Sequence, residues 1–167
     1  MFRIHLDYLC SLADRYRTVT KVVGRLHMPG QQKIEYSQLE VGYQFPPSSY
    51  KPDASIVSTY LKAVEDTSRL YQDTKLVPPT AVAAYAMAAL SRSICLPPGA
   101  IHVSQELEFI DAVSVNDSLI SYARVSRKQS RGKFHLLAID LNVFNQNQKA
   151  VLAGKASFIL PEQDDGR

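Results

Sequence analysis

The stretch that decides the fold is Thr80-Ala81-Val82-Ala83-Ala84-Tyr85-Ala86-Met87-Ala88-Ala89-Leu90-Ser91-Arg92-Ser93-Ile94-Cys95. It holds six alanines between Ala81 and Ala89 and almost nothing polar before Ser91. Pro78-Pro79 precede it, and proline is favoured in the first turn of a helix. Small apolar side chains all round suit a helix buried close against a sheet. The sequence therefore predicts a central buried helix over residues 80–95.

After Leu96-Pro97-Pro98-Gly99 the apolar pattern changes from helical spacing to alternation. Turn residues at 115–117, 130–132 and 145–147 divide this part into four stretches of roughly ten residues. Long strands joined by short turns indicate an antiparallel meander and an α+β domain. The residues expected on one face of each strand are Ile101, Val103, Gln105, Leu107 and Phe109; Leu119, Ser121, Ala123 and Val125; His135, Leu137, Ile139, Leu141 and Val143; and Leu152, Gly154, Ala156, Phe158 and Leu160.

Upstream of the central helix, the sequence predicts a strand over 39–47 and a second helix. Asp53 follows Pro52 and is a plausible N-cap for a helix that runs to about Glu65. Ile56, Tyr60, Leu61 and Val64 would lie on one face of this helix. Residues 66–76 are expected to form a loop that leads into Pro78-Pro79.

This loop and the start of the central helix resemble the MaoC-like hydratase/dehydratase family, which acts on enoyl or 3-hydroxyacyl thioesters. The family's catalytic half reads roughly Gly-Asp-x-Asn-Pro-Leu-His-x-Asp, followed by Ala-His-Gly-Met at the start of a helix. The matching residues are Glu65-Asp66-Thr67-Ser68-Arg69-Leu70-Tyr71-Gln72-Asp73 and Val77-Pro78-Pro79-Thr80, and a second marker is Ile101-His102-Val103-Ser104-Gln105-Glu106-Leu107-Glu108-Phe109. The resemblance covers most of residues 36–161. It implies a hot-dog fold, in which a curled antiparallel sheet wraps around a central helix.

The resemblance also implies a site, with two of its catalytic elements replaced. Asp66 is kept, but Tyr71 stands at the family's histidine, and an unperturbed tyrosine pKa near roughly 10 makes a poor base at neutral pH. Pro79 stands at the glycine whose N–H polarises the thioester carbonyl, and proline has no N–H. The N–H of Thr80 is the nearby donor that would replace the missing glycine N–H. Ser68 takes the asparagine position, and Tyr85 and Gln105 complete the expected substrate-binding residues.

A closer match is the non-catalytic subunit of heterodimeric (R)-3-hydroxyacyl-ACP dehydratases, together with the N-terminal half of double hot-dog hydratases. In that branch the aspartate stays, the histidine is commonly aromatic and Pro-x-Thr begins the helix. The resemblance implies an acyl-thioester-binding half that dimerises with a catalytic hot-dog partner. Two alternatives stay open: a self-sufficient homodimeric (R)-enoyl-CoA hydratase using Asp66 with Tyr71, and an acyl-CoA sensor without chemistry. No cofactor is expected, because hydration of a thioester needs only proton transfer and carbonyl polarisation.

Charge and composition narrow the function classes further. The net charge of +3 lies within residues 1–35, where six Lys/Arg face three acidic residues, and residues 36–167 sum to zero. A nucleic-acid binder carries its basic patch on the folded body, so nucleic acid is not the expected partner. No apolar run approaches the roughly 20 residues that span a bilayer. A cluster of five basic residues lies around the end of a predicted hairpin: Arg124, Arg127, Lys128, Arg131 and Lys133. The cluster is either an ordinary solvated turn or a binding site, and such a site would attract CoA phosphates or an acidic carrier protein.

Cysteine and histidine give no sign of a disulfide framework or a metal site. Cys10 and Cys95 show no CxxC spacing and are expected to be free thiols in the reducing cytoplasm. His5, His27 and His135 form no metal-spaced set. We expect residues 1–35 to be a poorly packed extension, 36–161 to be the domain and 162–167 to be a short tail. A transit peptide or a start at Met28 are the alternatives for the extension.

Overall fold

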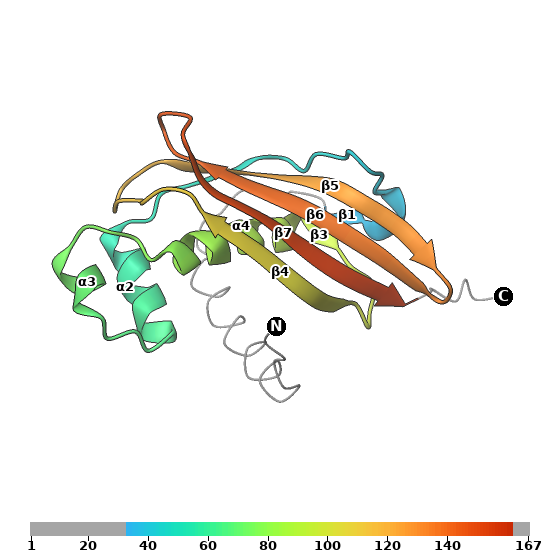
Figure 1. The fold of residues 1–167 in the computed structure, drawn as a ribbon, viewed down its shortest axis with the longest axis horizontal. Coiled ribbons are helices and arrows are strands. Elements are labelled where there is room, and N and C mark those ends of the chain that lie inside the picture. The colour runs from blue at the N-terminus through green and yellow to red at the C-terminus, as the bar shows by residue number, and fades with distance from the viewer. Residues whose placement is uncertain (1–32, 162–167) are drawn as a thin grey trace.

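The computed structural model describes residues 33–161 of the chain (Figure 1). A long sheet forms one layer, the longest helix lies against it, and two shorter helices sit together at one end. The elements are β1 (Ile34–Glu35), the 3-10 helix η1 (Tyr36–Gln38), β2 (Ser48–Tyr50), α2 (Ala54–Ala63), α3 (Arg69–Asp73), α4 (Pro79–Ser93), β3 (Ile94–Cys95), β4 (Ile101–Phe109), β5 (Leu119–Arg131), β6 (Phe134–Phe144) and β7 (Ala150–Pro161).

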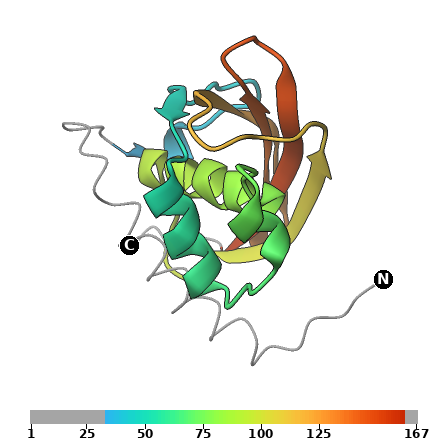
Figure 2. The ribbon, with the colours of Figure 1, turned by 90° about the vertical axis from the view of Figure 1, so that its left-hand side faces the viewer.

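The predicted central helix and curled sheet are confirmed. The five-stranded sheet has the order β2-β5-β6-β7-β4 with antiparallel pairing throughout, and it curves around α4 (Figure 2). Alternation predicted the buried faces of β6 and β7 well, because Leu137, Ile139 and Leu141 are at most 1% exposed. These side chains pack under α4 and remove apolar surface from water.

The prediction of a continuous meander is wrong at its first strand. β5, β6 and β7 form hairpins, but β4 pairs with β7 at the sheet edge and does not touch β5 as a neighbour. A bulge between His102 and Ser104 also shifts the faces of β4, so His102 rather than Ile101 lies on the helix side with Gln105. Alternation along a sequence carries no information on strand order, and one extra residue in a bulge reverses the faces beyond it.

The helices match the prediction with two differences. Asp53 caps α2 as expected, with its Oδ1 accepting a hydrogen bond from Ile56 N at 2.8 Å. The predicted loop after α2 contains a further short helix, α3. The central helix ends at Ser93, and Ile94–Cys95 form β3 in parallel pairing with β1. β-branched and apolar Ile94 suits a strand as well as a helix.

The predicted strand over 39–47 is wrong, since these residues form an irregular segment along β5. Gly42 N donates to Val125 O at 2.8 Å and Phe45 N donates to Ala123 O at 2.9 Å, and regular pairing begins only at β2. Lys128 of β5 holds the same segment, with its ammonium against Leu39 O and 4.9 Å from the Tyr36 ring centroid.

Two groups of core side chains lie along α4, one toward each end of the helix. The first joins α2 to the N-terminal half of α4, and the second joins the C-terminal half to β5, β6 and β7. Cys10, the possible transit peptide and the tail over 162–167 lie outside the described residues. Among the helices of residues 33–161, none has the length and apolar content that a bilayer crossing requires.

Candidate functional site

The loop that carries the candidate residues starts from a defined helix end. Glu65 has a φ of 56° in the left-handed region, its N–H donates to Lys62 O, and Asp66 N donates to Leu61 O at 2.9 Å. These two bonds are the Schellman pattern that commonly ends a helix at a glycine. Here a glutamate occupies that position, which costs backbone free energy that glycine would not.

Asp66 and Ser68 then build the start of α3. Asp66 Oδ1 accepts from Ser68 N at 2.8 Å, and Ser68 Oγ accepts from Leu70 N at 3.3 Å. The Asp66 carboxylate therefore has a local role in shaping the turn, and Ser68 is the N-cap of α3. The second Asp66 oxygen remains available to another group.

A cavity of about 930 Å³ opens between α2, the α3 loop and the loop that connects β4 with β5. Two backbone hydrogen bonds fix its far wall: Val77 N donates to Val113 O at 2.8 Å and Val115 N donates to Lys75 O at 2.6 Å. The lining residues are Ala54, Val57, Ser58, Leu61, Lys62, Glu65, Asp66, Thr67, Tyr71, Gln72, Thr74, Lys75, Val115 and Asn116. Its size lies within the range of small-molecule and cofactor sites.

The structure brings Asp66 and Tyr71 together in this cavity. Tyr71 is partly buried and packs against the core group at the N-terminal half of α4. Ser68, Pro79, Thr80, Tyr85 and Gln105 are not among the described residues that line it. Two of the seven predicted site residues thus share one space.

Pro79 and Thr80 form the first turn of α4, beyond the cavity's lining. Pro78 is the N-cap residue, and Ala81 N donates to Pro78 O at 2.9 Å. The first N–H groups of a helix have no acceptor within the helix, and Thr80 N–H is one of them. Thr80 N–H therefore remains a donor that a ligand carbonyl could use.

Tyr85 lies in the core, where burial raises its pKa to about 12. Its hydroxyl donates to Ile56 O at 3.5 Å, and its ring lies 5.5 Å from that of Tyr50. Burial raises the pKa of Tyr50 further, and its hydroxyl donates to Val82 O at 3.3 Å. Both tyrosines are held protonated and link α2 and β2 to the central helix.

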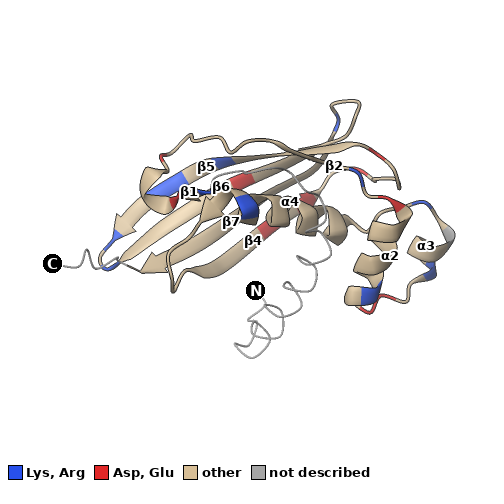
Figure 3. Ribbon diagram, turned by 180° about the vertical axis from the view of Figure 1, so that it is seen from behind, with Lys and Arg blue, Asp and Glu red and all other residues tan. Residues whose placement is uncertain are grey.

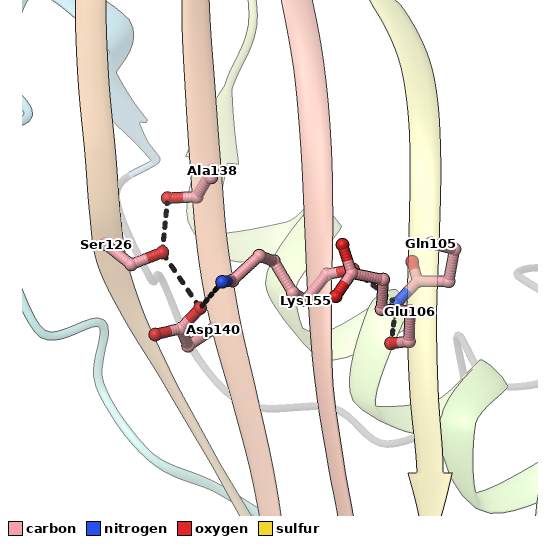
Figure 4. Close-up of polar contacts among 6 residues, drawn as sticks. All are labelled: Gln105, Glu106, Ser126, Ala138, Asp140 and Lys155. Atoms are coloured by element: carbon pink, nitrogen blue, oxygen red, sulfur yellow. Dashed lines mark hydrogen bonds and ion pairs between the residues drawn. The ribbon is translucent and has the colours of Figure 1, made fainter.

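Gln105 lies on β4 (Figure 4) and does not line the cavity at the α2–α3 end. Its Nε2 donates to the carbonyls of Glu106 at 3.4 Å and Lys155 at 3.3 Å. Its Oε1 is buried without a hydrogen-bond donor among the described residues. The side chain therefore joins β4 to β7 through Lys155 O rather than facing the cavity.

Charged residues that the sequence reading missed also line the cavity. Lys62 and Lys75 are among its lining residues, together with the acidic residues Glu65 and Asp66. Both lysines flank the stretch that resembles the family motif, so their position in the chain was a usable signal. Of the three non-glycine residues with positive φ in residues 33–161, two, Glu65 and Asn116, lie in this lining as well.

The basic group of the β5–β6 hairpin lies at the opposite end of the molecule from α2 and α3 (Figure 3). Lys128 is bound to the 36–40 segment, with Glu40 at 3.7 Å, and Arg127 hydrogen-bonds Gln129. This separation excludes the hairpin from the same chain's cavity.

The cavity lining holds two acidic residues, two lysines and a tyrosine, but no histidine. His102 stacks on Phe158 at 4.8 Å and His135 hydrogen-bonds Ser130, both on the sheet. Among residues 33–161, no group of three His, Cys, Asp or Glu side chains is placed to hold a metal ion. The arrangement suits binding of a polar group more directly than it suits acid–base catalysis.

Solved structures share this architecture. The unliganded R-hydratase PhaJ1 from Pseudomonas aeruginosa is 23% identical, with 78% of this chain and 88% of that chain covered and a TM-score of 0.66. The MaoC-like dehydratase from Rhodospirillum rubrum is 17% identical, covering 78% and 98%, with a TM-score of 0.60.

The truncated HadBC (3R-hydroxyacyl-ACP dehydratase) complex from Mycobacterium tuberculosis is 16% identical, covering 71% and 96%, with a TM-score of 0.54. No protein-family model and no curated protein sequence matches the chain. At these identities the likeness establishes the fold, so the chain has the hot-dog fold of these hydratases and dehydratases.

Proposed function

We propose that this chain is a MaoC-like family protein of the cytoplasm that binds an acyl thioester and acts beside a catalytic hot-dog partner. The observation that carries the proposal is the cavity that holds Asp66 and Tyr71 without a histidine. A general base for water addition must titrate near neutral pH, which an imidazole does and an ordinary phenol does not. The partner would supply the histidine for reversible hydration of an (R)-enoyl thioester.

The similarity to PhaJ1 and to the HadBC complex supports the substrate class and a two-chain assembly. Lys62 and Lys75 support the binding of an anionic carrier group, since both lysines line the cavity. Thr80 N–H supports polarisation of the thioester carbonyl, although Pro79 removes the neighbouring donor.

A second candidate is a complete hydratase that uses Asp66 with Tyr71, and one observation favours it. The two side chains line the same cavity, so a water molecule there can contact both. Asp66 would then act as the base and accept a proton from the water, while Tyr71 donates a hydrogen bond. The ordinary pKa of an aspartate is low, so this carboxylate would be a weak base.

The test combines crotonyl-CoA binding, measured by calorimetry, with crotonyl-CoA hydration by the 167-residue chain alone. Asp66→Asn keeps an oxygen for Ser68 N while removing the charge, and Tyr71→Phe keeps the ring that packs on the core. We expect binding without turnover in all three proteins. Turnover that both substitutions abolish would establish the second candidate instead.

A double Lys62→Ala/Lys75→Ala variant completes the design. We expect it to bind crotonyl-CoA at least about tenfold more weakly, since both charges face the cavity. Lys133→Ala, in the turn between β5 and β6, lies outside the cavity lining, so it is the matched control and should leave binding unchanged. Absence of binding in the unsubstituted chain would refute the proposed function.

A further inference from the structure

A second cavity, of about 320 Å³, lies between α4, β3, β4 and β7. Its lining is apolar apart from one serine and one histidine: Met87, Leu90, Ser91, Ile94, Leu96, His102 and Phe158. None of these residues lines the cavity at the α2–α3 end. Ser91 and His102 are exposed and Met87 and Leu96 are half-buried, so the cavity is open to water. An open apolar cavity of this size is a surface that a binding partner can cover.

The chain enters the described domain directly beside this cavity. β1, the first described strand, pairs in parallel with β3, and Ile34 lies opposite Ile94 in this register. Ile94 lines the cavity, and Ile34 packs against the group of core side chains to which Ile94 belongs. Residues 1–32 precede β1, so they are tethered next to the cavity.

The sequence of this extension contains an apolar stripe that needs a partner. Five apolar side chains recur at helical spacing, which would place them on one face of a helix over residues 5–16: Leu6, Leu9, Leu12, Ala13 and Tyr16. Asp7, Ser11 and Asp14 would lie on the opposite face. A helix with one apolar face is stabilised mainly by packing that face against another apolar surface.

The connection between the stripe and the domain is long enough for this packing. Residues 17–32 separate Tyr16 from the described domain, and 16 extended residues span up to roughly 50 Å. The 15 residues of α4 extend over only about 22 Å, so the stripe can reach any part of the cavity. A tether of this length gives a local concentration on the order of 1 mM, so modest apolar contacts suffice to hold the segment.

Charge favours the same occupant. Residues 1–32 contain five Lys/Arg and two acidic residues, a net charge of +3. Residues 93–123, which include β3, β4 and three of the lining residues, contain four acidic residues and no lysine or arginine. Opposite net charges attract the segment towards this part of the domain.

We propose that residues 5–16 bind as a helix in this cavity of the same chain, with the apolar stripe against Leu90, Leu96 and Phe158. The domain is then the partner that the stripe requires. This gives a packed position to part of an extension for which the sequence alone predicts poor packing. It also covers His102 and leaves the cavity at the α2–α3 end open.

The chain carries two natural reporters for this contact. Cys10 lies within the segment, and Cys95 lies in β3 next to Ile94. They are the two cysteines of the sequence, so a short bismaleimide can join this one pair within a molecule. We expect the reagent to join them in the reduced 167-residue chain at least about tenfold faster than in a Leu9→Asp/Leu12→Asp variant, because docking adds to the proximity that the tether provides.

Matched controls separate docking from other effects. Ser11→Asp/Thr18→Asp adds the same charge to the opposite face of the predicted helix and should keep the fast reaction. On the domain, Ser91→Arg places a long charged side chain at the open side of the cavity and should slow the reaction to the rate of the leucine variant. Ser58→Arg, at an exposed serine of α2 outside this cavity, should leave the rate unchanged. Circular dichroism checks that each variant keeps the fold.

A second measurement needs no thiol chemistry. The sequence has no tryptophan, so Tyr16→Trp introduces a single indole into the apolar stripe. We expect its emission to lie at shorter wavelength than that of an exposed indole, and acrylamide to quench it weakly. Adding Ser91→Arg should abolish both effects, whereas adding Ser58→Arg should preserve them.

Either of two results would overturn the proposal: equal cross-linking rates in the unsubstituted chain and the leucine variant, or an indole that acrylamide quenches equally with and without Ser91→Arg. Cross-linked dimers in place of cross-linked monomers would show that the segment binds a second copy, which also contradicts it. These measurements contain no thioester, so their outcome is independent of the proposed acyl-binding function.

Discussion

Glu65 shows how a single residue at the rim of the cavity sets the local stability. Its positive φ closes the end of α2, and a side chain with a Cβ is strained there. We expect Glu65→Gly to raise the free energy of unfolding by about 0.5–1 kcal/mol, and Glu65→Val to lower it by about 1 kcal/mol. Urea unfolding measures both. Glu65→Ala removes only the carboxylate and should change little; equal gains in Ala and Gly would assign the effect to charge.

His102 gives the chain a pH dependence that can be isolated. Packing against Phe158 and the end of α4 desolvates the ring and lowers its pKa below 6.5, although neighbouring polar groups act in the opposite direction. A lowered histidine pKa means that the unfolded chain binds the proton more tightly. Stability from this group is complete above about pH 6.5 and is lost as the pH falls through the folded pKa.

The measurement is the difference in unfolding free energy between the unsubstituted chain and His102→Gln from pH 7.5 to pH 5. We expect this difference to move against the unsubstituted chain on acidification. Carboxylates that titrate at lower pH affect both proteins equally and cancel. A difference that stays constant over the range would contradict the burial of the ring.

At the element scale, β7 has no room for a side chain at Gly154, where it pairs with β4. A Cβ at this position would lie 2.8 Å from Glu106 O and 3.1 Å from Leu107 Cδ2. The backbone carbonyl cannot move without disturbing the pairing, so Gly154→Ala should lower the unfolding free energy by about 1–3 kcal/mol. Ala153→Ser, on the solvent side of the same strand, is the control. A loss of similar size in both variants would point to a general intolerance of β7.

The elements also show what the sequence could and could not predict. The alanines of α4 and the alternation of β6 and β7 predicted the core because burial alone imposes those patterns. The position of β4 beside β7 depends on contacts between distant residues, which no local pattern records. The short helix α3 rests on one Ser68 cap within polar sequence, so periodicity could not find it. Motif resemblance predicted that Asp66 and Tyr71 share a site, whereas Lys62 and Lys75 lie outside the motif and were recognised only from the cavity lining.

The molecule as a whole is divided into a rigid part and a more weakly held part. β4 to β7 share long hydrogen-bonded ladders, whereas α2 and α3 are held by a few core side chains such as Val57 and Leu61 and by the Tyr85 hydroxyl. Segments with few buried contacts open at lower free energy than a central sheet. Amide hydrogen exchange should therefore be faster in α2 and α3 than in β5, β6 and β7.

The same experiment links this division to function. A ligand in the cavity contacts α2, the α3 loop and the 115–116 segment together, so it should stabilise the weakly held part first. We expect saturating crotonyl-CoA to slow exchange in residues 54–75 and 113–116 and to leave the centres of β6 and β7 unchanged. The Lys62→Ala/Lys75→Ala variant should lose most of this protection at the same ligand concentration. Protection spread evenly over the sheet, or confined to the basic hairpin at the far end, would place the ligand elsewhere and exclude the cavity as its site.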